Sequence, residues 1–335
     1  MKVIIRAFIK SLGYLLGLVF GLSLAILLVL SICVSLMKLH SDLEVLPNSE
    51  GIKQDLGKTS PIILEIKLHG VIASSYNTAE KIKSVLLECE NSQIKDRVKG
   101  ILLCVNSPGG EVFNANEIYS TLNSWKKRTL CPVYVYVEGL CASGAYYISC
   151  AADKIYTNDI SLIGSIGVTS SPFFNVKEAL AKIGIDSLVL SSGKDKSSLS
   201  PFKEWTESEK ESRQNLLDFF YSNFLDVVLK SRKQLTRELL VKEIGANVFP
   251  PKMALDYGLI DEINVTRDIV LYDLVKELGI QDDYRVVSFD KEQMLKKFFS
   301  AVSSSPLFSG KMKHELIMNE TNSHLNYEYL YGQDS

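Results

Sequence analysis

Between residues 61 and 190 the sequence alternates short β-branched runs with segments of helical spacing, and this alternation constrains the fold most strongly. The spacing predicts strands at residues 61–72, 98–105, 132–137, 154–157 and 187–190. It predicts helices at residues 78–89, 114–127, 142–152 and 176–183. The run VKGILLCV is apolar almost throughout, which is typical of a strand buried on both faces. The pattern therefore predicts an α/β fold with a mostly parallel sheet, flanking helices and right-handed crossovers.

Four regions are predicted along the chain. Residues 1–40 form an N-terminus and membrane anchor, and residues 41–60 form a polar linker. Residues 61–300 form the folded domain, whose second half is mainly helical and includes a long helix at 207–230. Residues 301–335 are rich in Ser, Asn and Tyr, which predicts a flexible C-terminal tail.

The predicted anchor rests on residues 14–37, which are 24 positions without a charged side chain. At about 1.5 Å per residue such a helix crosses a hydrocarbon core of roughly 30 Å. Basic residues precede the stretch, whereas Lys38 behind it is followed by Asp42 and Glu44. This bias predicts a cytoplasmic N-terminus, with the remainder outside the cytoplasm. A cleaved signal peptide is the alternative. Its apolar region is normally shorter than these 24 residues, and no convincing Ala-x-Ala cleavage site follows them here.

Composition narrows the function classes. The 37 Lys and Arg residues nearly balance the 39 Asp and Glu residues, which argues against a general nucleic-acid binder. The six cysteines form no CxxC pair and have no histidine at zinc-finger spacing, so we expect neither a metal nor another cofactor. Most of them lie in apolar runs and are expected to be buried, while disulfides stay open as an alternative.

Two segments at predicted strand ends carry candidate catalytic groups, because open α/β sheets place their sites there. In SPGG at residues 107–110, paired glycines let backbone N–H groups approach a ligand, as an oxyanion hole requires. In GLCASGAYY at residues 139–147, Ser143 lies among small residues at a strand-to-helix turn, where a nucleophilic hydroxyl can be exposed. The alternatives are a plain turn for the first segment, and a helix cap or close packing for Ser143.

The base for such a serine is predicted to be a lysine. Of the four histidines only His69 lies in the sheet region, so a Ser-His-Asp triad depends on it alone. A lysine serves as a base when desolvation lowers its pKa toward neutrality. The segment GKDKSSLSPF offers Lys194 and Lys196, which polarity and spacing do not separate. Ser165 in the segment IGSIGV is a candidate for orienting the amine.

The segments SPGG, CASGAYYISCAADKIY, GSIGV and GKDKSSLSPF occur in this order over about residues 60–265. In this combination the chain resembles the short form of bacterial signal peptide peptidase A (protease IV) of peptidase family S49. The resemblance implies a Clp protease/crotonase-like fold. It also implies a Ser-Lys dyad of Ser143 and Lys196, with Ser165 orienting the lysine. The N–H groups of Gly110 and Ser143 are implied as the oxyanion hole.

The resemblance further implies a serine endopeptidase that degrades leftover signal peptides and other apolar peptides without ATP. The implied location is the bacterial inner membrane, with one crossing and an extracytoplasmic catalytic domain. The long form draws Ser and Lys from two repeated halves, whereas this chain has one such half. A ring-like homo-oligomer is therefore implied, and whether Lys196 serves Ser143 of its own chain or of a neighbour stays open at this point. A crotonase-like acyl-CoA enzyme and a non-catalytic membrane scaffold are the alternatives.

Overall fold

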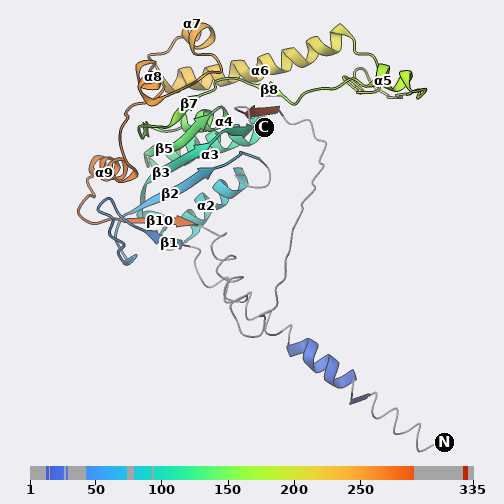
Figure 1. Cartoon of the computed structure of the whole chain (residues 1–335). Helices are drawn as coiled ribbons and strands as arrows, with labels where there is room; N and C mark the ends of the chain where they lie inside the picture. The colour runs from blue at the N-terminus through green and yellow to red at the C-terminus, as the bar shows by residue number, and fades with distance from the viewer. Residues whose placement is uncertain are drawn as a thin grey trace, which may run out of the picture. The chain divides into compact units, whose positions relative to one another are not determined.

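The computed structural model describes residues 13–14, 16–25, 28, 43–73, 79–92 and 94–289, together with the backbone of 327–330. Contacts divide the chain into two units, residues 1–43 with 290–310 and residues 44–289 with 311–335. The second unit contains every predicted site residue, and the description below concerns this unit unless stated otherwise (Figure 1).

A parallel-rich sheet forms the centre of this unit, with strand order β1-β10-β2-β3-β5-β7-β9 and with β6 also paired to β5. Five pairings are parallel, namely β10–β2, β2–β3, β3–β5, β5–β6 and β5–β7, and β7–β9 is antiparallel. The predicted mixed α/β fold with a mostly parallel sheet is confirmed. The strands are β1 (Leu43–Leu46), β2 (Ile62–His69), β3 (Val98–Ser107), β5 (Val133–Ala142), β6 (Lys154–Thr157), β7 (Leu162–Gly164), β9 (Val248–Phe249) and β10 (Arg285–Phe289).

Helices connect and cover these strands, and five of them overlap the helices predicted at 78–89, 114–127, 142–152, 176–183 and 207–230. They include α2 (Ala79–Asn91), α3 (Val112–Thr129), α4 (Gly144–Ser149), α5 (Lys177–Lys182), α6 (Glu207–Ser231), α7 (Arg237–Leu239), α8 (Pro251–Asp256) and α9 (Arg267–Glu277). The predicted strand at 187–190 is wrong, since these residues are irregular. Leu188 and Leu190 are 82% and 83% exposed, so the β-forming run has no neighbouring strand to pack against.

One face of the sheet packs against α9. Successive strand residues point to opposite faces, and Ile63, Leu102 and Tyr134 share the face that forms a core cluster with Leu274 of α9. Gly100 on β3 makes this close approach feasible, because a Cβ there would lie 3.3 Å from a methyl group of Leu274. The alternation assigns the opposite face to α2 and α3, whose buried residues include Leu86, Ile118 and Leu122.

The predicted linker and tail both contain ordered strands. Residues 41–60 were expected to be a tether, yet Leu43–Leu46 form β1 at the edge of the sheet beside β10. Most of the predicted flexible tail 301–335 lies outside the described residues, but Tyr327–Leu330 form strand β11. This strand is the middle of a three-stranded sheet with β4 (Gly109–Glu111) and β8 (Thr169–Ser170), in the order β4-β11-β8.

The predicted membrane span at residues 14–37 lies mostly outside the described residues. Residues 16–25 are helical. Within the described part of the chain, no helix has the length and apolarity needed to cross a membrane.

The packing of α9 yields a stability prediction. Leu274 is completely buried, so Leu274→Ala should lower the free energy of unfolding by about 2–5 kcal/mol through lost apolar burial and a residual cavity. Ile269 on the same helix is 44% exposed, and Ile269→Ala is the matched control, with an expected change of about 0.5 kcal/mol. Urea unfolding followed by tryptophan fluorescence measures both. Equal losses in the two variants would contradict the assignment of the α9 face.

Candidate active site

Ser143 lies at a strained turn between β5 and α4. Its backbone angles are φ 55° and ψ −120°, a region that residues other than glycine seldom adopt. The side chain is 1% exposed and does not cap α4, and its Oγ has no hydrogen-bond partner among the described residues. The cap that was the alternative explanation for this serine is therefore absent. Such strain, at about 1–3 kcal/mol, and an unpartnered buried hydroxyl, at about 1–3 kcal/mol, are typical of functional sites.

The pairing of β5 with β7 fixes this turn. The N–H of Ser143 donates to the carbonyl of Gly164 at 2.9 Å, and the carbonyl of Ser143 accepts from Tyr147 N at 2.9 Å, which starts α4. Position 164 requires glycine, because a Cβ there would lie 2.5 Å from the carbonyl oxygen of Asn247. Ser165 follows directly, with φ 53° and 5% exposure, and its N–H donates to Asn247 O at 2.7 Å. The structure thus brings Ser165 beside Ser143.

Gly110 also lies at this edge of the sheet. Ser107 at the end of β3 pairs with Cys141 of β5, and β4 contacts α4, so the SPGG segment adjoins the turn at Ser143. A Cβ on Gly110 would lie 1.9 Å from the carbonyl oxygen of Ile72, so only glycine fits this approach. The predicted neighbourhood of Gly110, Ser143 and Ser165 therefore exists within one chain.

One detail of the predicted oxyanion hole is wrong. The N–H of Ser143 is engaged with Gly164 O and is not turned toward a ligand. The following N–H belongs to Gly144, the first residue of α4, and the first N–H groups of a helix have no partner within the helix. In strand-to-helix nucleophile turns the N–H of the residue after the nucleophile is the usual oxyanion donor, which is the signal that the sequence reading missed.

Lys196 does not join Ser143 within the chain. It is exposed in a turn, and Ser143 Oγ has no partner among the described residues, so no hydrogen bond links the two side chains. The lysine belongs to a segment that we call the arm, residues 171–206 between β8 and α6. In Figure 1, α5 of the arm lies beside the N-terminal end of α6, away from the main sheet. Lys194 lies in the same exposed turn.

Other groups near the site have structural explanations. His69 Nε2 at the end of β2 and Glu138 Oε2 in the middle of β5 lie 2.7 Å apart, and this hydrogen bond lowers the pKa of Glu138. His69 is not a partner of Ser143 Oγ, so the histidine triad is not formed. Burial raises the pKa of the Cys141 and Cys150 thiols to about 12, which makes them inert at neutral pH. The five described cysteines are free and buried, as predicted from their apolar runs.

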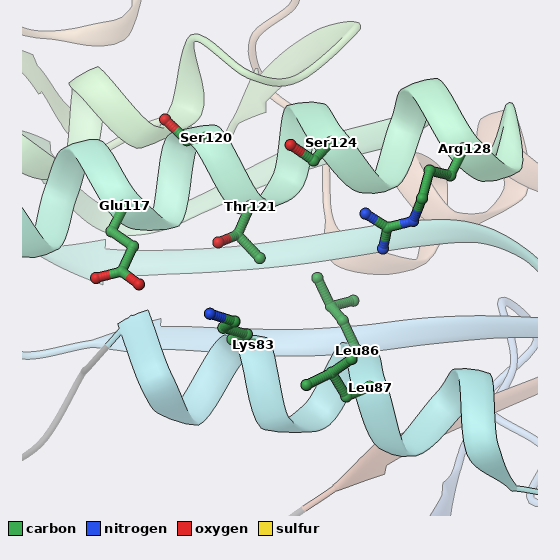
Figure 2. A pocket seen from close by; sticks show the side chains of 8 residues that line it. All are labelled: Lys83, Leu86, Leu87, Glu117, Ser120, Thr121, Ser124 and Arg128. Carbon is green, nitrogen blue, oxygen red and sulfur yellow. The ribbon is translucent and has the colours of Figure 1, made fainter.

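A cleft of about 300 Å³ lies between α2 and α3, away from these residues (Figure 2). Lys83 and Leu86 of α2 line it from one side, and Glu117 and Arg128 of α3 line it from the other. None of the predicted site residues belongs to its lining. Across the described residues, no cluster of three or more His, Cys, Asp or Glu is placed to hold a metal ion.

Comparison with known proteins agrees with this arrangement. Residues 126–278 match the model of peptidase family S49, and residues 65–180 match the model of Clp protease. A putative protease of Synechocystis sp. is 30% identical over 207 residues, which cover 62% of this chain and 71% of that protein. The chain belongs to peptidase family S49. Ser143 and Ser165 lie within the residues matched by both family models, and Lys196 lies within those matched by the S49 model alone.

Other relatives carry protease names. A putative signal peptide peptidase SppA of Enterococcus faecium is 33% identical over 233 residues, covering 68% of this chain and 66% of that protein. A putative protease of Methanocaldococcus jannaschii is 37% identical over 173 residues, covering 52% of this chain and 54% of that protein. The chain thus spans about half to two thirds of the length of these two relatives. The family matches support a peptidase function.

The unpartnered hydroxyl of Ser143 yields a prediction that needs no substrate. Ser143→Ala removes a buried polar group without a hydrogen bond, so the free energy of unfolding should stay equal or rise by about 1 kcal/mol. Ser149 is the matched control, because its buried Oγ donates to Ala145 O at 2.8 Å and Ser149→Ala should cost about 1 kcal/mol. Chemical denaturation compares the two. A clear loss in Ser143→Ala alone would show that this hydroxyl has a structural role.

Proposed function

We propose that this S49 peptidase is a serine endopeptidase whose nucleophile is Ser143 and whose general base is Lys196 of a neighbouring copy. The observation that carries the proposal is the strained, buried turn at Ser143 with an unpartnered Oγ. A hydroxyl held in this way needs a partner, and none of the residues that the structure describes in one chain supplies it. Ser165, next to Gly164 in β7, is the side chain that would orient the incoming lysine amine.

The proposed reaction is an acyl transfer, first to Ser143 and then to water. As Ser143 Oγ bonds to the scissile carbonyl carbon, its proton passes to the neutral amine of Lys196. The oxyanion accepts hydrogen bonds from Gly110 N–H and Gly144 N–H. The C–N bond then breaks, and Lys196 gives its proton to the leaving amine. Water attacks the acyl-enzyme with Lys196 again as base, and the proton returns to Ser143 Oγ as the peptide acid departs.

The arm supports a dyad formed between copies. It exposes several large apolar side chains, more than a free surface of this size normally carries: Phe174, Ile183, Ile185, Leu188, Leu190 and Phe202. It is nevertheless internally tied, since Val176 N donates to Pro201 O at 2.9 Å and Ser187 Oγ donates to Phe202 O at 2.7 Å. A structured arm with an apolar surface fits burial against a second copy in a homo-oligomer.

The substrates that we propose are apolar peptides, signal peptide remnants among them. The proposal rests on the resemblance of the motifs and on the name of the relative from Enterococcus faecium. The uncharged residues 14–37 support a single-pass anchor in the bacterial inner membrane, with the catalytic domain outside the cytoplasm. An anchored enzyme would meet peptides that leave the bilayer.

The choice of lysine is tested by two neighbouring substitutions. Lys196→Ala should lower kcat/KM for a fluorogenic apolar peptide by about 10²–10⁴ fold, because general base catalysis is lost. Lys194→Ala, two residues away in the same exposed turn, should keep most of the activity. Steady-state kinetics on the two full-length proteins decides between them. Loss of activity in Lys194→Ala instead of Lys196→Ala would reject the assignment.

The dyad between copies is tested by complementation. Ser143→Ala and Lys196→Ala proteins should each be inactive, and mixing them after dissociation should restore activity. If copies assemble at random, about a quarter of the sites combine an intact Ser143 with an intact Lys196 of a neighbour. A control mixture of Ser143→Ala with the double variant should stay inactive. No recovery in mixed assemblies of confirmed mixed composition would place both groups in one chain.

A further inference from the structure

Strand β5 changes its sheet partner shortly before Ser143. Its first part pairs with β6 and its last part pairs with β7, while β3 lies along its other edge. Val137 and Cys141 have partners on β3 that are only two positions apart, so residues 138–140 of β5 face Asn106 alone. Residues 138–140 therefore form a β-bulge, a feature that re-aims the chain and is common next to active sites. We refer to them as the β5 bulge.

Side chains supply the hydrogen bonds that the neighbouring strands do not offer to the β5 bulge. Leu140 N–H donates to Asn106 Oδ1 at 3.1 Å. On the other side Asn158 Nδ2 donates to the carbonyl oxygen of Glu138 at 2.8 Å. The Oδ1 of this second amide accepts from Ser161 Oγ at 2.7 Å, which fixes its orientation. The bulge is thus held by one asparagine from each side.

Asn106 also fits closely against Gly139, the middle residue of the bulge. A Cβ at position 139 would lie 2.9 Å from Asn106 Oδ1, and its three nearest atoms would all belong to the Asn106 side chain. Gly139 does not have a positive φ, so its φ would permit alanine. The side chain of Asn106 is therefore what excludes a larger residue from this position.

The bulge leads directly into the turn at Ser143. Beyond it, β5 aligns with β7, and this alignment places Ser143 N at 2.9 Å from Gly164 O. Asn106 itself immediately precedes the segment 107–110, whose Gly110 we assign to the oxyanion hole. One side chain therefore connects the strand that carries the glycine donor with the strand that carries the nucleophile.

We propose that Asn106 is a positioning residue, which fixes the β5 bulge and thereby sets Ser143 Oγ relative to Gly110 N–H. Its effect on catalysis rests on the proposed peptidase function, whereas its effect on the rigidity of the turn does not. A nucleophile displaced by about 1 Å can react about 10² fold more slowly. The loss should appear in kcat and not in KM, because the position of the hydroxyl matters in the acyl transfer step.

Three variants of the full-length protein test the hydrogen bond. Asn106→Ala should lower kcat for the fluorogenic apolar peptide by about 10 to 10² fold at constant KM. Asn106→Asp keeps an oxygen acceptor for Leu140 N–H, so its kcat should stay within about threefold. Asn123→Ala is the matched control, because it removes a bond from Asn123 Nδ2 to Tyr119 O of 2.9 Å within α3 and should leave kcat unchanged. Circular dichroism and thermal unfolding establish that all three fold.

A second readout needs no peptidase activity. Amide hydrogen exchange, followed by mass spectrometry, reports how firmly the segment 138–147 is held. In Asn106→Ala this segment should exchange at least about tenfold faster, because the bulge loosens and Ser143 N–H loses protection. Asn106→Asp and Asn123→Ala should exchange like the unsubstituted chain.

Gly139→Ala tests the contact from the opposite side. The added methyl group displaces the Asn106 side chain, so Gly139→Ala alone should lower kcat by about 10 to 10² fold. In the double variant with Asn106→Ala the obstacle is absent, and kcat should be no lower than in the single variants. Residues that act through one contact are non-additive in this way.

The outcomes separate this proposal from the proposed function. Unchanged exchange of 138–147 in Asn106→Ala would overturn the role of Asn106 in holding the bulge. Faster exchange with unchanged kcat would overturn its role in catalysis. Equal losses in Asn106→Ala and Asn106→Asp, or losses that multiply in the double variant, would overturn the hydrogen bond and the contact as the cause. Faster exchange with no cleavage by any protein, the unsubstituted chain included, would support the role in the turn and reject the peptidase function instead.

Discussion

The hydrogen bond from Ser143 N–H to Gly164 O is the interaction on which the candidate site depends. It joins the end of β5 to the end of β7 and holds Ser143 at a positive φ while α4 begins. Gly164 in turn approaches Asn247 so closely that no side chain fits there. The cost of the strained serine is offset by the surrounding parallel sheet, whose central strands β2, β3 and β5 are mostly buried. Rigid elements therefore position the hydroxyl, as catalysis requires.

In the proposed mechanism, one chain by itself holds only part of the candidate site. The sheet supplies Ser143, Ser165 and the glycine backbone at one edge, whereas Lys196, the base that we propose, lies on the arm between β8 and α6. Strand β11 pairs with both β4 and β8, and β4 contacts α4 beside this edge. In our account, assembly with another copy is then a requirement for activity. A peptidase controlled in this way stays inactive as a free chain, which limits cleavage of unintended proteins.

The sequence predicted the parts of the fold that depend on local pattern. The β-branched runs at 98–105 and 132–137 became β3 and β5, and their common carboxyl edge brought the glycines of 107–110 next to Ser143. The prediction of a strand at 187–190 was wrong because a β-forming run needs a neighbouring strand, and β propensity alone does not reveal whether one exists. The strand β11 was missed for the same reason, since its partners lie more than 150 residues away.

The hydrogen bond from Ser143 N–H to Gly164 O could not be predicted from the sequence pattern either, because it follows from the register of β5 on β7.

The central claim is that Ser143 is a nucleophile activated by Lys196. Reaction of the full-length protein with a fluorophosphonate, with the modified residue identified by mass spectrometry, tests this most directly. We predict an adduct on Ser143 that forms at least about 10² times more slowly in Lys196→Ala. An adduct on another serine, or equal rates in both proteins, would contradict the account.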